Sequence, residues 1–330
     1  KELLPLLRRQ TTRNPLEYKD KINKKTMSTQ LTETLLEDQE DRKGIESETQ
    51  CQSLWKMSSF AANVYLSLVF QICPQMINIF LVAPYSDDQA ILEGLSMSSM
   101  FVNITGFSIA VGLGSALESY GAQAYGAGNY THVGLYLQKT VIMVLVVMTV
   151  CLTLFQFVEP ALLAMNLSPE AASYSQRYVN ISQFGFPFLI TSVLYDFYLN
   201  CQKVSRPQMW ASALCFFFYP LIGWFFITHL QWGIEGCAMA MTIYPIMQCI
   251  AVVVIVRIGK FSDERTWGGL SRDAFKDLGP YVKKSLQTLV LRSVDWWAFE
   301  ILTLQVGIMS HMAGKPELLA ANNIIMNAFT

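Results

Sequence analysis

The chain is divided into a polar first part and a series of long apolar runs. Residues 1–57 carry many charges of both signs, and from Ser58 onward apolar residues dominate. A helix needs about 20 mostly apolar residues to cross the hydrocarbon core of a bilayer. The pattern predicts seven membrane-spanning helices, near residues 59–83, 92–116, 139–159, 178–201, 208–229, 235–258 and 285–310. An eighth apolar run begins near Leu318 and continues to Thr330.

These runs predict an all-α, polytopic membrane protein. They are too long for the strands of an outer-membrane barrel, which have about ten residues of alternating polarity. The composition agrees, since 52% of the residues are hydrophobic and only 15% are charged, whereas soluble proteins carry about 25% charged residues. The seven cysteines show no Cys-x-x-Cys or Cys/His spacing, so neither a zinc site nor a disulfide framework is predicted. The net charge of −1 gives no indication of nucleic-acid binding.

The distribution of basic residues predicts the orientation in the membrane. Of the 24 Lys and Arg residues, 21 fall on one side of the alternating spans: before Ser58, at Lys139, at Lys203 and Arg206, and from 257 to 284. Such residues concentrate in cytoplasmic loops. We therefore expect a cytoplasmic N-terminus, which excludes the topology of a seven-helix receptor. We expect the plasma membrane or a vacuolar-type organelle membrane as the location.

Four parts follow from these patterns. Residues 1–57 are predicted to be a disordered cytoplasmic tail, because mixed charge and few aromatic residues bury too little surface for folding. Residues 58–258 form a six-helix lobe, 259–284 a basic cytoplasmic linker, and 285–330 the start of a second lobe. The last apolar run ends without a polar tail, so we expect a C-terminally truncated piece of a longer protein.

Charged side chains interrupt the seventh predicted span. An ionised group at mid-membrane costs about 2.5–3.5 kcal/mol, so such residues face a water-filled cavity or each other. Asp295 and Glu300 are five residues apart and point about 140° apart on a helix. Arg292 and Asp295 can pair, which would keep Asp295 ionised. Glu300 has no local cation, and desolvation favours its protonated form, so it is our candidate for proton binding and release.

Aromatic residues flank these acids. Trp296, Trp297 and Phe299 are candidates for binding an organic cation through cation–π attraction. The alternative is that they pack against other helices or form an interfacial belt.

Other polar residues lie in or near the apolar runs. Asn78 and Asn103 are either satisfied bridges between helices or part of a substrate site. Glu118 and Gln123 lie at the cytoplasmic end of the second span, where we expect helix-end roles. Asp196 lies late in the fourth span, near the cytoplasm, and can be solvated there.

Several segments resemble one transporter family. Residues 101–108 read FVNITGFS, 114–128 read GSALESYGAQAYGAG, and 133–138 read VGLYLQ. They are similar, in order and spacing, to the V-N-x-T-G-F-S, A-L-[DE]-T, G-Q-A-[FY]-G-A and V-G-x-Y-L-Q pattern of the eukaryotic multidrug and toxic compound extrusion (MATE) family. Residues 295–300, DWWAFE, resemble its seventh-helix E-W-W-x-[FY]-E, and 267–271, WGGLS, its linker W-x-G-[FL]-S.

The resemblance implies a fold of twelve helices in two six-helix lobes. This chain would supply the first lobe and the first one or two helices of the second. The implied activity is export of organic cations or amphipathic xenobiotics against proton entry, or sodium entry in some members. No enzymatic activity and no cofactor besides the coupling ion are implied, and we expect a monomer.

The family's residues can be placed on this sequence. Its two seventh-helix acids fall on Asp295 and Glu300, and its second-helix Asn falls on Asn103. The first-helix Asp of bacterial members is replaced by Asn78, which implies that a carboxylate relay of that type is absent. The family usually has an apolar residue where Arg292 stands, so it stays open whether Asp295 is functional or paired.

Two other functions remain as alternatives. A lipid or lipid-linked sugar flippase of related fold would line its cavity with many cations, and here only Arg292 is available. A truncated, non-transporting membrane protein is the second alternative.

Overall fold

The computed structural model describes residues 50–82, 89–313 and 322, and the elements in these ranges are all helical. In chain order they are α2 (Gln50–Val82), α3 (Gln89–Val102), the π-helix η2 (Asn103–Phe107), α4 (Ser108–Gly126), α5 (Tyr130–Leu154), the 3-10 helix η3 (Phe155–Phe157), α6 (Val158–Ala164), α7 (Pro169–Ser182), α8 (Phe186–Cys201), α9 (Arg206–Gly223), the π-helix η4 (Trp224–His229), α10 (Gly233–Gly259), the 3-10 helices η5 (Glu264–Thr266) and η6 (Arg272–Phe275), and α11 (Leu278–Ala313).

The chain separates into two units, residues 1–59 and residues 60–330. Most of the predicted tail lies outside the described residues. Helix α2 begins at Gln50, before the predicted start of the first span. The helices from α3 to α11 all belong to the second unit.

Five helical segments of the described chain are long and apolar enough to cross a membrane. They are Gln52–Val82, Ala90–Gly126, Tyr130–Ala164, Arg206–His229 and Gly233–Gly259. They coincide with the first, second, third, fifth and sixth predicted spans. The seventh predicted span lies inside α11, whose shorter apolar stretch is Trp296–Met309. The eighth predicted run, from Leu318, falls outside the described residues.

The fourth predicted span is not one continuous helix. It is divided between α7 and α8 by a break at residues 183–185. Pro187 stands in the first turn of α8, where its missing N–H costs no helical hydrogen bond. A Cβ on Gly185 would lie 2.9 Å from the Thr242 backbone, so glycine permits α10 to approach the break closely. Thr242 Oγ1 lies 3.1 Å from the carbonyl oxygen of Ile181, so α10 also contacts the break through a polar group.

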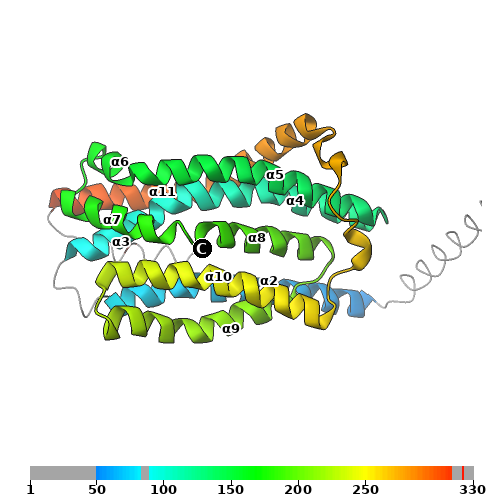
Figure 1. Cartoon of the computed structure of the whole chain (residues 1–330), viewed down its shortest axis with the longest axis horizontal. Helices are drawn as coiled ribbons and strands as arrows, with labels where there is room; N and C mark the ends of the chain where they lie inside the picture. The colour runs from blue at the N-terminus through cyan, green and yellow to red at the C-terminus, as the bar shows by residue number, and fades with distance from the viewer. Residues whose placement is uncertain (1–49, 83–88, 314–321, 323–330) are drawn as a thin grey trace, which may run out of the picture. The chain divides into compact units, whose positions relative to one another are not determined.

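Helix α8 is the central element of the unit. It packs against α4 and α5 on one side and α10 on the other (Figure 1). Helix α11 packs along α4, and α9 packs against α10. A Cβ on Gly112 of α4 would lie 2.5 Å from Leu289 Cδ1, so α4 and α11 approach closely at this point. Thr288 Oγ1 also donates to the Gly112 carbonyl at 3.3 Å.

The linker between α10 and α11 is fixed to the ends of α5 and α8. Gln138 of α5 donates to the Gly269 carbonyl at 2.8 Å and accepts from the Ser271 amide at 3.0 Å. Tyr198 of α8 and Thr266 share a hydroxyl hydrogen bond of 2.5 Å. We call this end of the helices the linker end.

Charged side chains of the same linker also contact α5 and each other. The Arg265 guanidinium lies 4.1 Å from the centre of the Tyr130 ring and pairs with Asp263 at 3.0 Å. Hydrogen bonds from Arg265 hold the pKa of Asp263 below its usual range. The pair therefore stays charged at neutral pH.

Replacing Gln138 by Leu should release the segment around Ser271. The substitution removes both hydrogen bonds to the linker backbone, and each lost bond that leaves a group unsatisfied costs about 1–3 kcal/mol. Hydrogen exchange should show faster exchange of the Ser271 amide. A matched control is Gln156→Leu, since Gln156 bonds the exposed Gln183 side chain instead of the linker. A Ser271 amide that stays as protected as in the wild type would contradict the assigned contact.

Candidate functional site

The polar residues Asn103 and Glu300, predicted in the second and seventh spans, meet in the structure. Asn103 Nδ2 donates to Glu300 Oε1 at 2.8 Å, across the contact of η2 with α11. Both side chains are half-buried. The amide N–H of Asn103 can only donate, so this hydrogen bond stabilises the ionised form of Glu300. A hydrogen bond to a charged group is worth about 1.5–3 kcal/mol.

The helix is wound as a π-helix where it presents Asn103. Residues Asn103–Phe107 form this wide turn between α3 and α4, and the Ser108 N–H bonds the Asn103 carbonyl. Gly106 allows the turn to pack, because a Cβ there would lie 2.6 Å from the Phe186 ring. Such single π turns often occur at functional sites.

The aromatic residues of α11 have different surroundings. The Trp296 ring lies 5.5 Å from that of Phe107, centre to centre. Trp297 Nε1 donates to Ser108 Oγ at 2.9 Å. Both tryptophans thus contact the segment that also presents Asn103 to Glu300. Phe299 is 41% exposed and is the aromatic residue of the three that is most open to a ligand.

Three other predicted residues lie toward the linker end. Glu118 is half-buried, and its carboxyl interacts with the Asn200 side chain and with the charge of Arg292. Arg292 itself is exposed, as is Gln123 in the last turns of α4. Asp295 belongs to α11, but its side chain is outside the described part of the chain, so its pairing with Arg292 stays a prediction.

Asn78 lies in a different contact. Its Oδ1 accepts a 2.6 Å hydrogen bond from Tyr219 of α9, and Asn78 is only 2% exposed. The Tyr219 ring stacks edge-on against Tyr244 of α10. The structure therefore joins Asn78 to α9 and α10, and not to the contact of Asn103 with Glu300. Its substrate-binding role remains a prediction.

One expectation about solvation is wrong. Asp196 is only 5% exposed instead of being solvated. The sequence places it five residues before the end of α8, but the first turn of α9 and the middle of α10 cover it. Its surroundings include Gln208, Tyr244 and Cys249.

Sequence reasoning also missed two participants of the site. Ser108 and Phe107 contact the α11 tryptophans, and both lie in the FVNITGFS segment of residues 101–108. Their position in the same segment as Asn103 was the one sequence feature that could have indicated that they contribute to the site.

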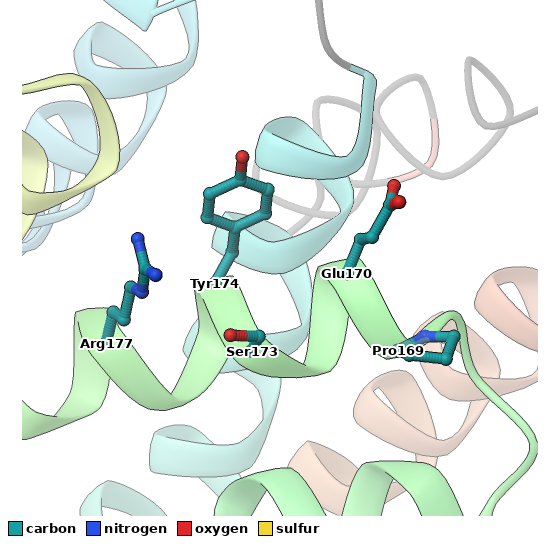
Figure 2. A pocket seen from close by; sticks show the side chains of 5 residues that line it. All are labelled: Pro169, Glu170, Ser173, Tyr174 and Arg177. Atoms are coloured by element: carbon teal, nitrogen blue, oxygen red, sulfur yellow. The ribbon is translucent and has the colours of Figure 1, made fainter.

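A shallow depression of about 400 Å³ lies elsewhere, on α7. Glu170, Tyr174 and Arg177 extend from one side of that helix (Figure 2), beside Pro169 and Ser173. It includes none of the predicted site residues, and one helix face alone cannot enclose a ligand.

No group of three or more His, Cys, Asp and Glu side chains that could hold a metal ion occurs in the part of the chain that the structure describes.

Comparisons with known proteins identify the family. The MatE family profile matches residues 64–225. "Multidrug and toxin extrusion protein 1" of Danio rerio is 32% identical over 219 residues, which are 66% of this chain and 37% of the relative. "Protein DETOXIFICATION 52" of Arabidopsis thaliana is 30% identical over 66% of this chain and 43% of its own length. The chain thus spans less than half of these two relatives.

The fold is that of solved MATE structures. The eukaryotic MATE transporter AtDTX14 superposes with a TM-score of 0.72 at 20% identity, over 84% of this chain and 60% of that one. The profile match, the relatives and the fold agree, and they identify the chain as a member of the MATE family of membrane transporters, which are not enzymes.

Proposed function

We propose that this chain forms the first lobe and the coupling helix of an antiporter that exports organic cations or related xenobiotics in exchange for protons. The observation that carries the proposal is the contact of Glu300 with Asn103. The chain spans 37% of the length of its zebrafish relative, so the activity belongs to a longer assembly that contains it.

The coupling rests on a single carboxyl group that binds one positive charge at a time. Ionised Glu300 attracts a cationic substrate, and the N–H of Asn103 stabilises this form. When a proton binds Glu300, the negative charge disappears and the cation loses its counter-charge. The partly apolar surroundings favour the protonated form once the substrate has left. Proton and substrate therefore exclude each other, which is the requirement for exchange.

The cargo class is supported by two features. Relatives are named for multidrug and toxin extrusion. Phe299, 41% exposed, lies one residue before Glu300 on the same turn of α11, and a cation over an aromatic face gains about 0.5–2 kcal/mol. Together they favour flat or hydrophobic organic cations.

The proposed orientation in the membrane is supported by the placement of Lys and Arg. We propose a cytoplasmic N-terminus and linker, a monomeric protein, and entry of the coupling proton from the opposite side. The membrane is the plasma membrane or a vacuolar-type organelle membrane.

A gradient experiment tests this function. The longest form of the protein that the gene encodes is reconstituted in vesicles loaded with a fluorescent organic cation. We expect efflux when a pH gradient is imposed and its loss when an ionophore collapses the gradient. Efflux that follows a sodium gradient at constant pH would reject proton coupling. Absence of cation efflux under either gradient would reject the antiporter.

A further inference from the structure

A second buried acid lies away from Glu300, where α8, α9 and α10 meet. Asp196 of α8 is 5% exposed, and the Gln208 side chain of α9, also 5% exposed, lies next to it as a possible hydrogen-bond donor. The titratable groups that act on Asp196 from α10 are Tyr244 and Cys249. Both are uncharged at neutral pH in their ordinary range. Within the described residues, the ion pairs join other side chains and leave Asp196 without a counter-charge.

Two oxygens at this place lack partners. Asp196 Oδ1 and Gln208 Oε1 are buried and make no hydrogen bond among the described residues. Buried polar atoms in native proteins are nearly always bonded, so each exception needs an explanation. An ionised carboxylate with neither counter-charge nor full hydrogen bonding is costly and normally becomes neutral instead.

The neighbouring polar side chains around Ser212 are fully hydrogen-bonded, so missing hydrogen bonds are not a general feature of this part of the structure. Ser212, one turn after Gln208, receives hydrogen bonds from Gln248 at 3.1 Å and Gln71 at 3.3 Å. A hydroxyl accepts two bonds and donates one. Its proton therefore goes to Ser67, 3.0 Å away. Among the described residues of α8 and α9, the other buried atoms without a partner are Ser192 Oγ, one turn before Asp196, and Asn200 Oδ1, one turn after it.

We propose that Asp196 and Gln208 form a second proton-binding site, in which one proton on Asp196 Oδ1 is donated to Gln208 Oε1. The acid and the amide then form a cyclic pair with two hydrogen bonds: Gln208 N–H to Asp196 and Asp196 O–H to Gln208. A single proton satisfies both unpartnered oxygens at once. A metal cation is disfavoured, because hard cations need about six oxygen ligands and these two oxygens supply few of them.

The site has a structural consequence when the proton leaves. The remaining anion needs water, and Asp196 lies five residues, or about 7 Å, from the end of α8. Water must enter at the linker end and separate α8 from the first turn of α9. Proton loss at Asp196 therefore loosens this end of the lobe, independently of any event at Glu300.

Infrared spectroscopy of the full chain in lipid nanodiscs tests the site. In Glu300→Gln, which removes the acid of the contact with Asn103, we expect a protonated-carboxyl C=O band at neutral pH. Adding Asp196→Asn should abolish this band, whereas adding Glu235→Gln, at an exposed acid, should not change it. Gln208→Leu should shift the band to higher frequency, because the acid loses its acceptor. A band unaffected by Asp196→Asn, or removed when sodium replaces choline, overturns the proposal.

Thermal stability provides a second measurement that does not depend on the band. Asparagine reproduces the protonated acid, because an Asn–Gln amide pair makes the same two hydrogen bonds. We expect Asp196→Asn to leave the melting temperature at pH 7 unchanged. A marked loss of stability would show that the carboxylate is ionised and bound to a cation, and would overturn the proposal. Neither measurement uses transport, so the result is separate from the role of Glu300.

Discussion

Replacing Glu300 by Gln should reduce proton-driven efflux of an organic cation by about 10- to 100-fold. Gln keeps the size of the side chain and an oxygen that accepts from Asn103, so the contact of η2 with α11 is retained. The variant can neither carry a negative charge nor bind a proton. The loss of a charged partner, about 1.5–3 kcal/mol, corresponds to this fold-change.

Vesicle efflux under an imposed pH gradient measures the effect. Glu235→Gln is the matched control, because this exposed acid pairs with Arg177 on the surface and has no contact with the site. The control should transport like the wild type. Unchanged gradient-driven efflux in Glu300→Gln would remove Glu300 from the mechanism. A variant that loses stability as well as transport would point to a structural role instead.

Replacing Gly112 by Val should strongly destabilise the protein. A Cβ at this position would lie 2.5 Å from Leu289 Cδ1 and 2.9 Å from Leu289 Cα. The first atom can rotate away, but the second belongs to the backbone of α11, so the two helices must separate. Overpacking of this kind costs about 1–3 kcal/mol. Separation would also lengthen the 3.3 Å bond from Thr288 to Gly112.

Melting temperature in detergent and lipid measures this change. Gly126→Ala is the control, since a Cβ there meets nothing within 4 Å. If the Leu289 side chain is part of the clash with a Cβ at position 112, the Leu289→Ala substitution should partly restore the melting temperature of a Gly112→Ala variant. A Gly112→Val protein that melts like the wild type would show that α11 does not pack closely on α4.

The sequence predicted the order of the helices well, and it singled out Asn103 and Glu300 separately, without their contact. Long apolar runs are a strong signal, and five of the seven predicted spans are found as long apolar helices. Asn103 and Glu300 stood out because polar atoms in a span need a partner. Their pairing required the three-dimensional arrangement, because 197 residues separate them.

Other features depend on contacts that one segment cannot reveal. The break between α7 and α8 is stabilised by Thr242 from α10. The burial of Asp196 comes from α9 and α10, although its position near a helix end predicted solvation. Hydropathy averages each segment separately and therefore misses both effects.

The wide turn at Asn103–Phe107 changes which residues can act together. Asn103 and Ser108 are five positions apart, a spacing that in a regular α-helix directs two side chains about 140° apart. The π-helix closes its ring between these two residues, which brings them toward a common direction. The extra residue of the π-helix therefore lets two successive turns contact the same helix, α11, through Asn103 with Glu300 and Ser108 with Trp297. Deleting one residue within 104–106 would restore the regular α-helical spacing and leave one of these two contacts.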